Sequence, residues 1–444
     1  MASAGSGPIP IPAEAPLHVS SLRILGLSQT RESFLQSVVS DIFTATNTEE
    51  VLKSVKAAAG RLQRHDIFEE IKVYLNSPKS MDDTVDVTFD LKEKPHGFLS
   101  TTFGAGENEA TLNGAVSLRN LFGGAETATA TYQFGNRTKA AVEGSLGIPI
   151  NGSPDARAEA FVNGYIKDHS MINHYQENAK IAGIRFKAAS AYGQHEVGYG
   201  LVQREITAMP KSSATVRAHS GANLKSSVFH TFVSDSRNSA SMPTEGRYLG
   251  VSQEIAGVGQ LGDAAFVKQQ IEVHVHQILV QADKKGATPQ IVLNAGAKAG
   301  FLLPLGGEDR QINVSDRFYV GGPLSVRGFK MGGIGDREGN DALGGNLFYA
   351  AGLSLTSSIP GAADLPIKAH AFFNAGSILQ TKQGVAPNDV LGELINSSRT
   401  AAGFGLVLHN DVGRIEANFC IPLKFQAGDV PKPGLQFGLG INFL

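Results

Sequence analysis

Apolar residues in positions 17–95 follow the spacing of a small α/β module. Leu17–Leu27, Glu69–Leu75 and Thr84–Leu91 are predicted strands, and the last of them alternates apolar with polar residues. Asn47 and Glu50 form a capping-box-like pair where a helix would begin. Two helices are predicted from apolar residues at helical spacing, at Phe34, Leu35, Val38, Val39, Ile42 and Phe43 and at Val51, Leu52, Val55, Ala59 and Leu62. The predicted order is β-α-α-β-β.

The pattern changes at Gly97, beyond which segments of about ten residues alternate in polarity. Only 4 of the 51 glycines precede residue 96, and glycine suits a strongly curved sheet. In Phe266–Val280, Ile271 and Val273 share one face, whereas Lys268 and Glu272 lie on the other. Such a strand can separate lipid from water, although strands of a soluble sandwich also alternate. Roughly 350 residues at about 22 per strand and connection predict an all-β transmembrane barrel of about 16 antiparallel strands.

The composition of the chain narrows the range of possible partners and membrane signals. The formal net charge of -2, with acids and bases nearly balanced, argues against nucleic acid as a partner. Residues 1–16 lack the basic and apolar regions of a secretory signal, and we expect a flexible segment there. The sequence contains no run of about 18 apolar residues, so no transmembrane helix is predicted. The lack of tryptophan counts against the aromatic girdles of a barrel, but 24 Phe and 9 Tyr could substitute.

The candidate chemical motifs have simpler structural interpretations. Residues 257–262 have the G-x-G-x-x-G spacing of a dinucleotide loop, but a strand follows where the cofactor needs a helix, which favours a hairpin. His274 and His276 share a strand face without a third ligand at metal-site spacing, which favours polar residues facing a lumen. Cys420 is interpreted as a small packing residue. We therefore expect no enzymatic activity, no metal and no cofactor.

A glycine-rich connection at about residues 304–345 contains Arg327, flanked by glycines on both sides. Connections of this length without structure of their own are usually functional or disordered. An arginine carried into a barrel would need a hydrogen-bonding partner on the wall. The alternative is a flexible surface loop with an incidental arginine.

Several motifs together resemble those of the BamA-like β-barrel insertases, in particular their mitochondrial branch, the core subunits of the sorting and assembly machinery (SAM, or TOB, complex). The lumen-loop motif of that family resembles Val326, Arg327, Gly328 and Phe329, and its wall motif resembles Phe372, Asn374 and Gly376. Bacterial members tend to have aspartate where Asn374 stands, so Glu416 is a further candidate acid for the arginine. The β-α-α-β-β order is that of the polypeptide-transport-associated (POTRA) domain.

The end of the chain resembles the sorting signal of mitochondrial outer-membrane barrels, at Gln436, Gly438, Ile441 and Phe443. The resemblance implies a flexible segment at 1–16, one POTRA domain at 17–95, and a barrel at 96–444 with a lumen-inserted loop at about 304–345. It also implies a lateral seam between this last strand and a first strand that contains Gly97, Phe98, Leu99, Ser100, Thr101, Thr102 and Phe103.

The implied function is insertion and folding of β-barrel precursors in the mitochondrial outer membrane. The client's C-terminal signal would pair with the first strand at the seam, with the POTRA domain in the intermembrane space. The implied partners are client barrels such as porins, peripheral SAM subunits on the cytosolic face, outer-membrane lipid and a second copy of the chain. A protein-translocating pore of the same superfamily and a metabolite porin remain as alternatives.

Overall fold

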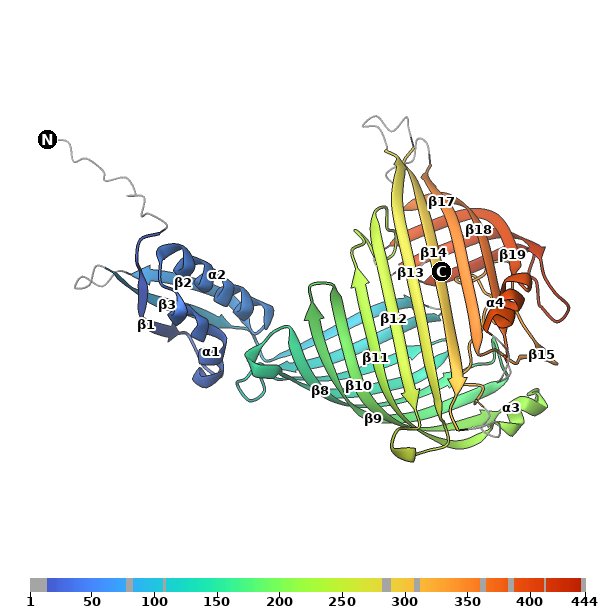
Figure 1. Ribbon diagram of the computed structural model, residues 1–444, viewed down its shortest axis with the longest axis horizontal. Coiled ribbons are helices and arrows are strands. Elements are labelled where there is room, and N and C mark those ends of the chain that lie inside the picture. The colour runs from blue at the N-terminus through green and yellow to red at the C-terminus, as the bar shows by residue number, and fades with distance from the viewer. Residues whose placement is uncertain are drawn as a thin grey trace. The chain divides into compact units, whose positions relative to one another are not determined.

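The structure is a computed structural model that describes residues 14–76, 83–106, 109–281, 289–306, 312–359, 365–381, 387–410 and 413–440. Its strands form a three-stranded sheet, a sixteen-stranded sheet and a two-stranded hairpin, which confirms the predicted number of strands in the large sheet. Figure 1 shows the small sheet with its helices in blue and the large sheet from cyan to red. None of the helices in the described ranges combines the length and apolar character needed to cross a bilayer.

The N-terminal module has the predicted order of elements. In chain order these are β1 His18–Leu25, α1 Glu32–Val39, the 3-10 helix η1 Ser40–Thr44, α2 Thr48–Arg64, β2 Phe68–Asn76 and β3 Thr84–Glu93. β3 lies in the centre of the sheet, parallel to β1 and antiparallel to β2. Leu35 of α1, Leu62 of α2 and Phe89 of β3 are among the buried residues that form its core. The Asn47 side chain caps α2 by accepting a hydrogen bond of 2.8 Å from the Glu50 amide.

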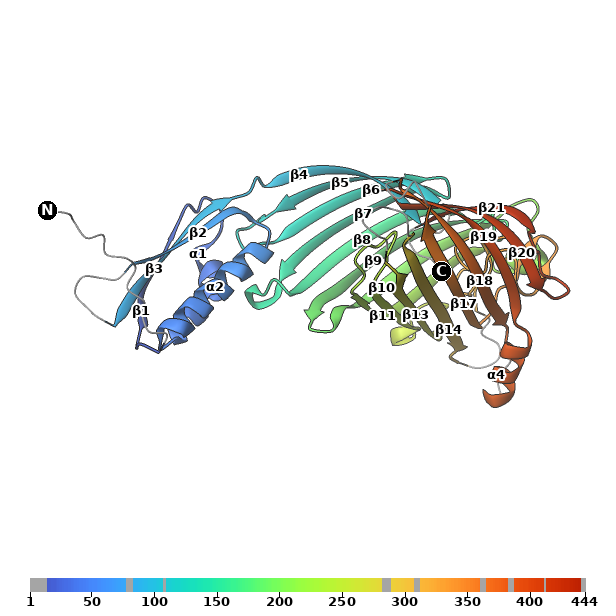
Figure 2. The same cartoon turned by 90° about the horizontal axis from the view of Figure 1, so that it is seen from above.

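The large sheet follows the chain from β4 to β21, and each strand between these two pairs with the strand before it and the strand after it in the sheet. Its strands are β4 Gly97–Gly106, β5 Glu109–Arg119, β6 Thr127–Gly135, β7 Thr138–Pro149, β8 Ala156–Asp168, β9 Tyr175–Ser190, β10 Gly193–Ala208, β11 Gly221–Asp235, β12 Gly246–Ala256, β13 Phe266–Val280, β14 Ile291–Pro304, β17 Leu347–Ser358, β18 Ile367–Leu379, β19 Arg399–Asn410, β20 Gly413–Lys424 and β21 Gly434–Gly440. β4 and β21 are the end strands, and within the described residues they are not hydrogen-bonded to each other. Figure 2 shows β4 to β8 following one another across the sheet.

In the described parts of the connections of the large sheet lie four short helices: η2 Ile150–Gly152, α3 Ala214–Ala218, η3 Val258–Gln260 and α4 Pro387–Asn396. η3 lies in the turn between the antiparallel strands β12 and β13, and Gly257 before it has a left-handed φ of 90°. The hairpin interpretation of residues 257–262 is therefore confirmed.

Residues 312–346, called the inner segment from here on, connect β14 to β17 and pack on one face of the large sheet. The segment includes the hairpin of β15 Arg337–Glu338 and β16 Asp341–Ala342. Its Phe318, Val320 and Phe329 form a buried cluster with Phe348 of β17 and Ala401 of β19. We call the sheet face that carries this cluster the inner face. The opposite, outer face exposes large apolar side chains that include Ile271, Leu353, Leu355, Phe373, Phe404 and Phe437.

Contacts divide the chain into two compact units. The first comprises the chain up to Leu99 together with Val116–Ala130 and Ser145–Glu159, and the second comprises the remainder. Within the first unit, the Arg31 amide donates to the Gly123 carbonyl at 2.8 Å, and the Arg31 guanidinium pairs with Glu126. The compact unit thus includes chain beyond the 17–95 range expected from the sequence.

Candidate functional site

Arg327 of the inner segment is fixed on the inner face by a buried ion pair. Its Nε and Nη2 atoms each donate a hydrogen bond of 3.0 Å to the carboxylate of Glu416 on β20. Nη1 lies 3.5 Å from Oδ1 of Asn374, and the guanidinium lies 5.1 Å from the ring centre of Phe372. Arg327 and Glu416 are both 0% exposed. Glu416, the alternative acid suggested by the sequence, is therefore the ionic partner, and Asn374 makes a longer contact.

Two glycines, Gly328 and Gly376, permit the inner segment to pack closely against the large sheet. Gly328 has a φ of 83°, in the left-handed region that other residues adopt only with strain. A Cβ atom on Gly376 would lie 2.6 Å from Cγ2 of Val326, so a larger residue there would displace the inner segment. The structure thus brings together the two groups of residues that the sequence singled out, 326–329 on the segment and 372–376 on β18.

The last described strand holds the same part of the segment. Gln436 of β21 accepts a hydrogen bond of 3.0 Å from the Gly328 amide and donates one of 2.8 Å to the Phe329 carbonyl. A Cβ atom on Gly438 would lie 3.1 Å from Pro323. Gln436 and Gly438 are therefore part of the surface of the sheet that the inner segment contacts. Ile441 and Phe443, the other two residues of the predicted sorting signal, lie outside the described residues.

A chain of side-chain hydrogen bonds supports Glu416 from the wall. Asn418 donates to Glu416 at 2.8 Å, and Asn418 Oδ1 lies 2.6 Å from Nε2 of His370 on β18. The other ring nitrogen of His370 lies 3.3 Å from the Ser354 hydroxyl of β17. Arg414 donates to the second oxygen of Glu416 at 2.6 Å. The hydrogen bonds from Asn418 and Arg414 thus orient the Glu416 carboxylate toward Arg327.

Asp316 forms a second anchor of the inner segment, and the sequence analysis missed it. The guanidinium of Arg204 on β10 donates to both carboxylate oxygens of Asp316, one of them at 2.9 Å. Lys268 of β13 donates to the Asp316 carbonyl at 2.7 Å. Burial alone would raise the pKa of Asp316, but the charges of Lys225 and Arg204 outweigh it and lower the pKa to about 2. Asp316 therefore remains charged at neutral pH.

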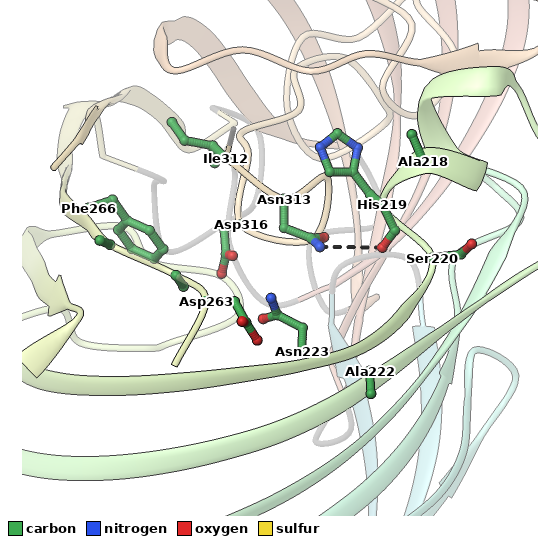
Figure 3. A pocket seen from close by; sticks show the side chains of 12 residues that line it. Ala218, His219, Ser220, Ala222, Asn223, Asp263, Phe266, Ile312, Asn313 and Asp316 are labelled. Carbon is green, nitrogen blue, oxygen red and sulfur yellow. Dashed lines mark hydrogen bonds between the residues drawn. The ribbon is translucent and has the colours of Figure 1, made fainter. Parts of the chain in front are cut away.

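Asp316 lies at a polar hollow of about 240 Å³ lined partly by Asn223 and Asp263. Figure 3 shows these side chains around the hollow. The side chain of Asn313 donates to the His219 carbonyl at its rim, at 3.4 Å. The only sequence signal for this anchor is the alternation of β10 and β13, which places Arg204 and Lys268 on the polar face of their strands. The two anchors have opposite polarity, because the segment supplies the acid at Asp316 and the base at Arg327.

The hairpin of the inner segment makes a third attachment. Asp341, which is 0% exposed, accepts hydrogen bonds from the amides of His174 and Ser213 at 2.8 and 2.6 Å. Glu338 accepts from the Ala214 and Thr215 amides at the start of α3. The connections that follow β8 and β10 are thereby tied to the inner segment.

β4 contains all seven residues predicted for the first seam strand. Phe98, Leu99 and Phe103 are 41%, 75% and 67% exposed, and Thr101 and Thr102 are exposed as well. As an end strand, β4 has one edge paired with β5. Its position makes it available as a template, and the pairing role itself remains a prediction.

His274, His276 and Cys420, which the sequence did not mark as functional, lie among ordinary packing and hydrogen-bonding neighbours. His274 and His276 are buried on the inner face, and His276 contacts Asn294 at 2.7 Å. Among the described residues, no group of three or more His, Cys, Asp or Glu side chains could hold a metal ion. Cys420 is buried and lies 3.4 Å from Gln436.

The Omp85 superfamily domain matches residues 120–443, most of the chain. The chain therefore belongs to the Omp85 superfamily.

Similar proteins show to which branch of the Omp85 superfamily the chain belongs. The sorting and assembly machinery component 50 homologue of Bos taurus is 32% identical over 94% of this chain and 89% of its own length. A SAM50-like protein of Schizosaccharomyces pombe is 29% identical over 97% of this chain and 91% of its own length. Within the superfamily, the chain belongs with the sorting and assembly machinery component 50 homologues, BamA-like β-barrel insertases of the mitochondrial outer membrane.

Solved structures agree on the fold. The crystal structure of BamA from Haemophilus ducreyi lacking POTRA domains 1–3 has a TM-score of 0.75 at 18% identity, and covers 95% of this chain and 84% of that one. CdiB from Acinetobacter baumannii has a TM-score of 0.52 at 12% identity, over 96% of this chain and 74% of its own. The predicted fold class, a transmembrane β-barrel with a POTRA-like N-terminal region, is confirmed.

Proposed function

We propose that this protein inserts and folds β-barrel precursors, such as porins, in the mitochondrial outer membrane by pairing each precursor's C-terminal signal with β4. The observation that carries the proposal is the position of β4 and β21 as the two end strands of the sixteen-stranded sheet. An unpaired strand edge is a template for an incoming strand. Each new pair would satisfy backbone groups that lipid cannot hydrogen-bond, at several kcal/mol per group.

The inner segment would brace the β21 side of this seam. Gln436 holds the segment at residues 328 and 329, and the Arg327–Glu416 pair lies one strand away on β20. A client could then exchange pairing at β4 while β21 keeps its position. The mechanism needs no catalytic residue, no cofactor and no nucleotide.

The relatives are named as components of a sorting and assembly machinery, which supports the proposal that this chain acts within a complex. We propose that the POTRA-like module faces the intermembrane space and hands clients on, and that peripheral SAM subunits bind the cytosolic face. A second copy of the chain and outer-membrane lipid complete the expected surroundings.

Disulfide crosslinking tests the pairing. In a Cys420→Ser background, one cysteine replaces Thr101 or Thr102, and a porin with single cysteines along its last strand is imported. We expect a crosslink that depends on the register of the client cysteine. A cysteine at Thr131 is the matched control, because β6 has a partner on both edges and should give no crosslink.

Two outcomes would count against the proposal. Normal porin assembly without a crosslink at any register would remove the pairing role of β4. Normal transport through a protein whose β4 and β21 are locked by a disulfide would favour a translocating pore, because a client passing through the lumen does not need the seam.

A further inference from the structure

An apolar cavity of about 430 Å³ lies between α4 and the strands β13, β14 and β17. Its floor is formed by strand residues and its rim by the helix, and the lining includes Ile271, Ala299, Phe301 and Tyr349 from the strands and Leu391 and Ile395 from α4. Figure 1 shows α4 near the ends of β17 and β18. No part of the loop anchors described above lines this cavity.

The cavity opens on the outer face. Phe348 of β17 packs against Phe318 of the inner segment, with ring centres 4.6 Å apart, so Phe348 points to the inner face. Successive residues of a strand point to opposite faces, and Leu347 and Tyr349 therefore point outward into the cavity. Ile271, which also lines it, continues along β13 into the exposed apolar residues Val273 and Val275. The cavity is thus continuous with the surface that this barrel presents to lipid.

The helix leaves apolar side chains over the opening. Leu394 of α4 is 6% exposed, whereas Leu391 and Ile395, which also line the cavity, are 55% and 58% exposed. In water such a surface would be unfavourable by about 25 cal/mol for each Å² of apolar area. The Tyr349 hydroxyl, a polar group in the lining, is already bonded to the Ser398 hydroxyl. The lining therefore favours a hydrocarbon occupant over water.

The positively charged side chain of Lys424 lies at the last turn of α4. The ammonium group of Lys424, an exposed residue at the end of β20, donates to the Asn396 carbonyl at 3.0 Å. Lysine side chains near a membrane boundary extend their charge toward the headgroup region. An acidic or phosphate headgroup would meet this charge while its chain lies along the outer face.

We propose that the cavity holds one acyl chain of a bilayer phospholipid, with its phosphate near Lys424. A lipid chain is favoured over a protein segment because the cavity opens on the outer face, next to the exposed apolar residues Val273 and Val275 of β13. The surrounding bilayer is as apolar as the cavity, so hydrophobicity alone gives an acyl chain no preference for the cavity. Its preference comes from van der Waals packing against the cavity lining. The proposal is independent of the pairing role of β4.

The absence of tryptophan from the chain permits a direct test. A single tryptophan replaces Leu391 at the cavity, and in a second variant replaces Phe404, which is 60% exposed on the outer face of β19 and does not line the cavity. Both proteins are reconstituted in vesicles with increasing fractions of a phosphatidylcholine brominated on its acyl chains. Tryptophan fluorescence is quenched where a brominated chain touches the ring.

We expect the L391W protein to reach half-maximal quenching at a mole fraction about threefold lower than the F404W protein, as fits the modest energies of packing in membranes. Adding Ala299→Leu to L391W fills the floor and should abolish the difference. I395W provides a second reporter if L391W lacks the heat-dependent gel migration of a folded barrel. Equal quenching curves would overturn the proposal, and an unquenched L391W would show that protein, rather than lipid, closes the cavity.

Discussion

Arg327 and Glu416 form a bidentate ion pair, with both hydrogen bonds at 3.0 Å, although neither side chain is exposed to solvent. Buried ion pairs need additional hydrogen bonds to offset the cost of removing both charges from water. Asn418 and Arg414 supply these to Glu416. The pair therefore fixes the position of the inner segment, and its removal leaves a buried charge without its counter-ion.

Replacement of Glu416 by alanine should destabilise the folded barrel by about 3–5 kcal/mol, because Arg327 would remain buried without its carboxylate. The midpoint of the heat-dependent gel shift measures this effect in detergent. Arg327→Met in the same background removes one of the two buried charges that Glu416 had paired, since Arg414 also contacts this carboxylate, and should recover part of the loss. An unchanged midpoint in the Glu416→Ala protein would contradict the assigned role of the pair.

An aspartate at position 374 should take over from Glu416. Asn374 already places Oδ1 at 3.5 Å from the guanidinium, and its buried Nδ2 has no partner among the described residues. In a Glu416→Gln background, Asn374→Asp restores a carboxylate beside Arg327 and removes the unpaired Nδ2 group of Asn374. We expect assembly of an imported porin to fall in the single Glu416→Gln protein and to recover in the double variant, as native gels would show. Asn374→Leu is the control without a carboxylate, and recovery with it would refute the charge argument.

Gly376→Ala should displace the inner segment, because an added Cβ atom would approach Val326 more closely than any other group, including the Tyr349 carbonyl oxygen at 3.0 Å. The added Cβ atom would lie 2.6 Å from Cγ2 of Val326, whose side chain is fully buried. Limited proteolysis should cut the segment faster in Gly376→Ala, and Val326→Ala should restore protection by removing the clashing methyl group. Gly392→Ala is the matched control, since nothing lies within 4 Å of an added Cβ atom there. Failure of Val326→Ala to rescue would place the strain elsewhere.

Acid should release one turn of the N-terminal module. Glu93 accepts hydrogen bonds from the Ser28 hydroxyl and from the Thr30 amide at 2.9 Å. Burial would raise the pKa of Glu93, but the bonds from Ser28 and Thr30 outweigh it and lower the pKa from 4.5 to about 2. A depressed carboxyl pKa stabilises the fold above pH 4.5, and this contribution is lost as the pH falls through about 2.

Hydrogen exchange measures this dependence at the backbone amides of residues 29 and 30. Their protection factors should hold from neutral pH to about pH 4 and decline toward pH 2. Glu93→Gln should show weaker protection without the acid-dependent decline. A decline of equal size in both proteins would assign the effect to another group.

Residue patterns predicted the large features of the fold because they repeat along the chain. Alternation over many strands gave the size of the sheet, and the helical spacing around Leu35 and Leu62 gave the N-terminal module. Arg327 was recognised from a local motif. Its partner was not settled, because the choice between Asn374 and Glu416 depends on strand register, and a shift of one residue would move either side chain to the outer face.

Contacts made across the sheet were harder to predict. Asp316 stands in an ordinary polar stretch, and its partners Arg204, Lys225 and Lys268 are scattered over β10, β11 and β13. Gln436 was interpreted as part of a terminal signal, whereas the structure places it against the backbone of residues 328 and 329. Such contacts have no periodicity, so they become visible only when strands distant in sequence are placed side by side.

The two anchors also constrain the order in which this chain can fold. Asp316 meets a residue 112 positions earlier, and Arg327 meets one 89 positions later. Contacts between distant residues form slowly, because the loop entropy between them must be lost first. The Arg327 anchor cannot form until β20 has joined the sheet, so docking of the inner segment is completed late in the protein's own maturation. A chain whose final hairpin is missing or out of register would keep its arginine in water and would not complete this step.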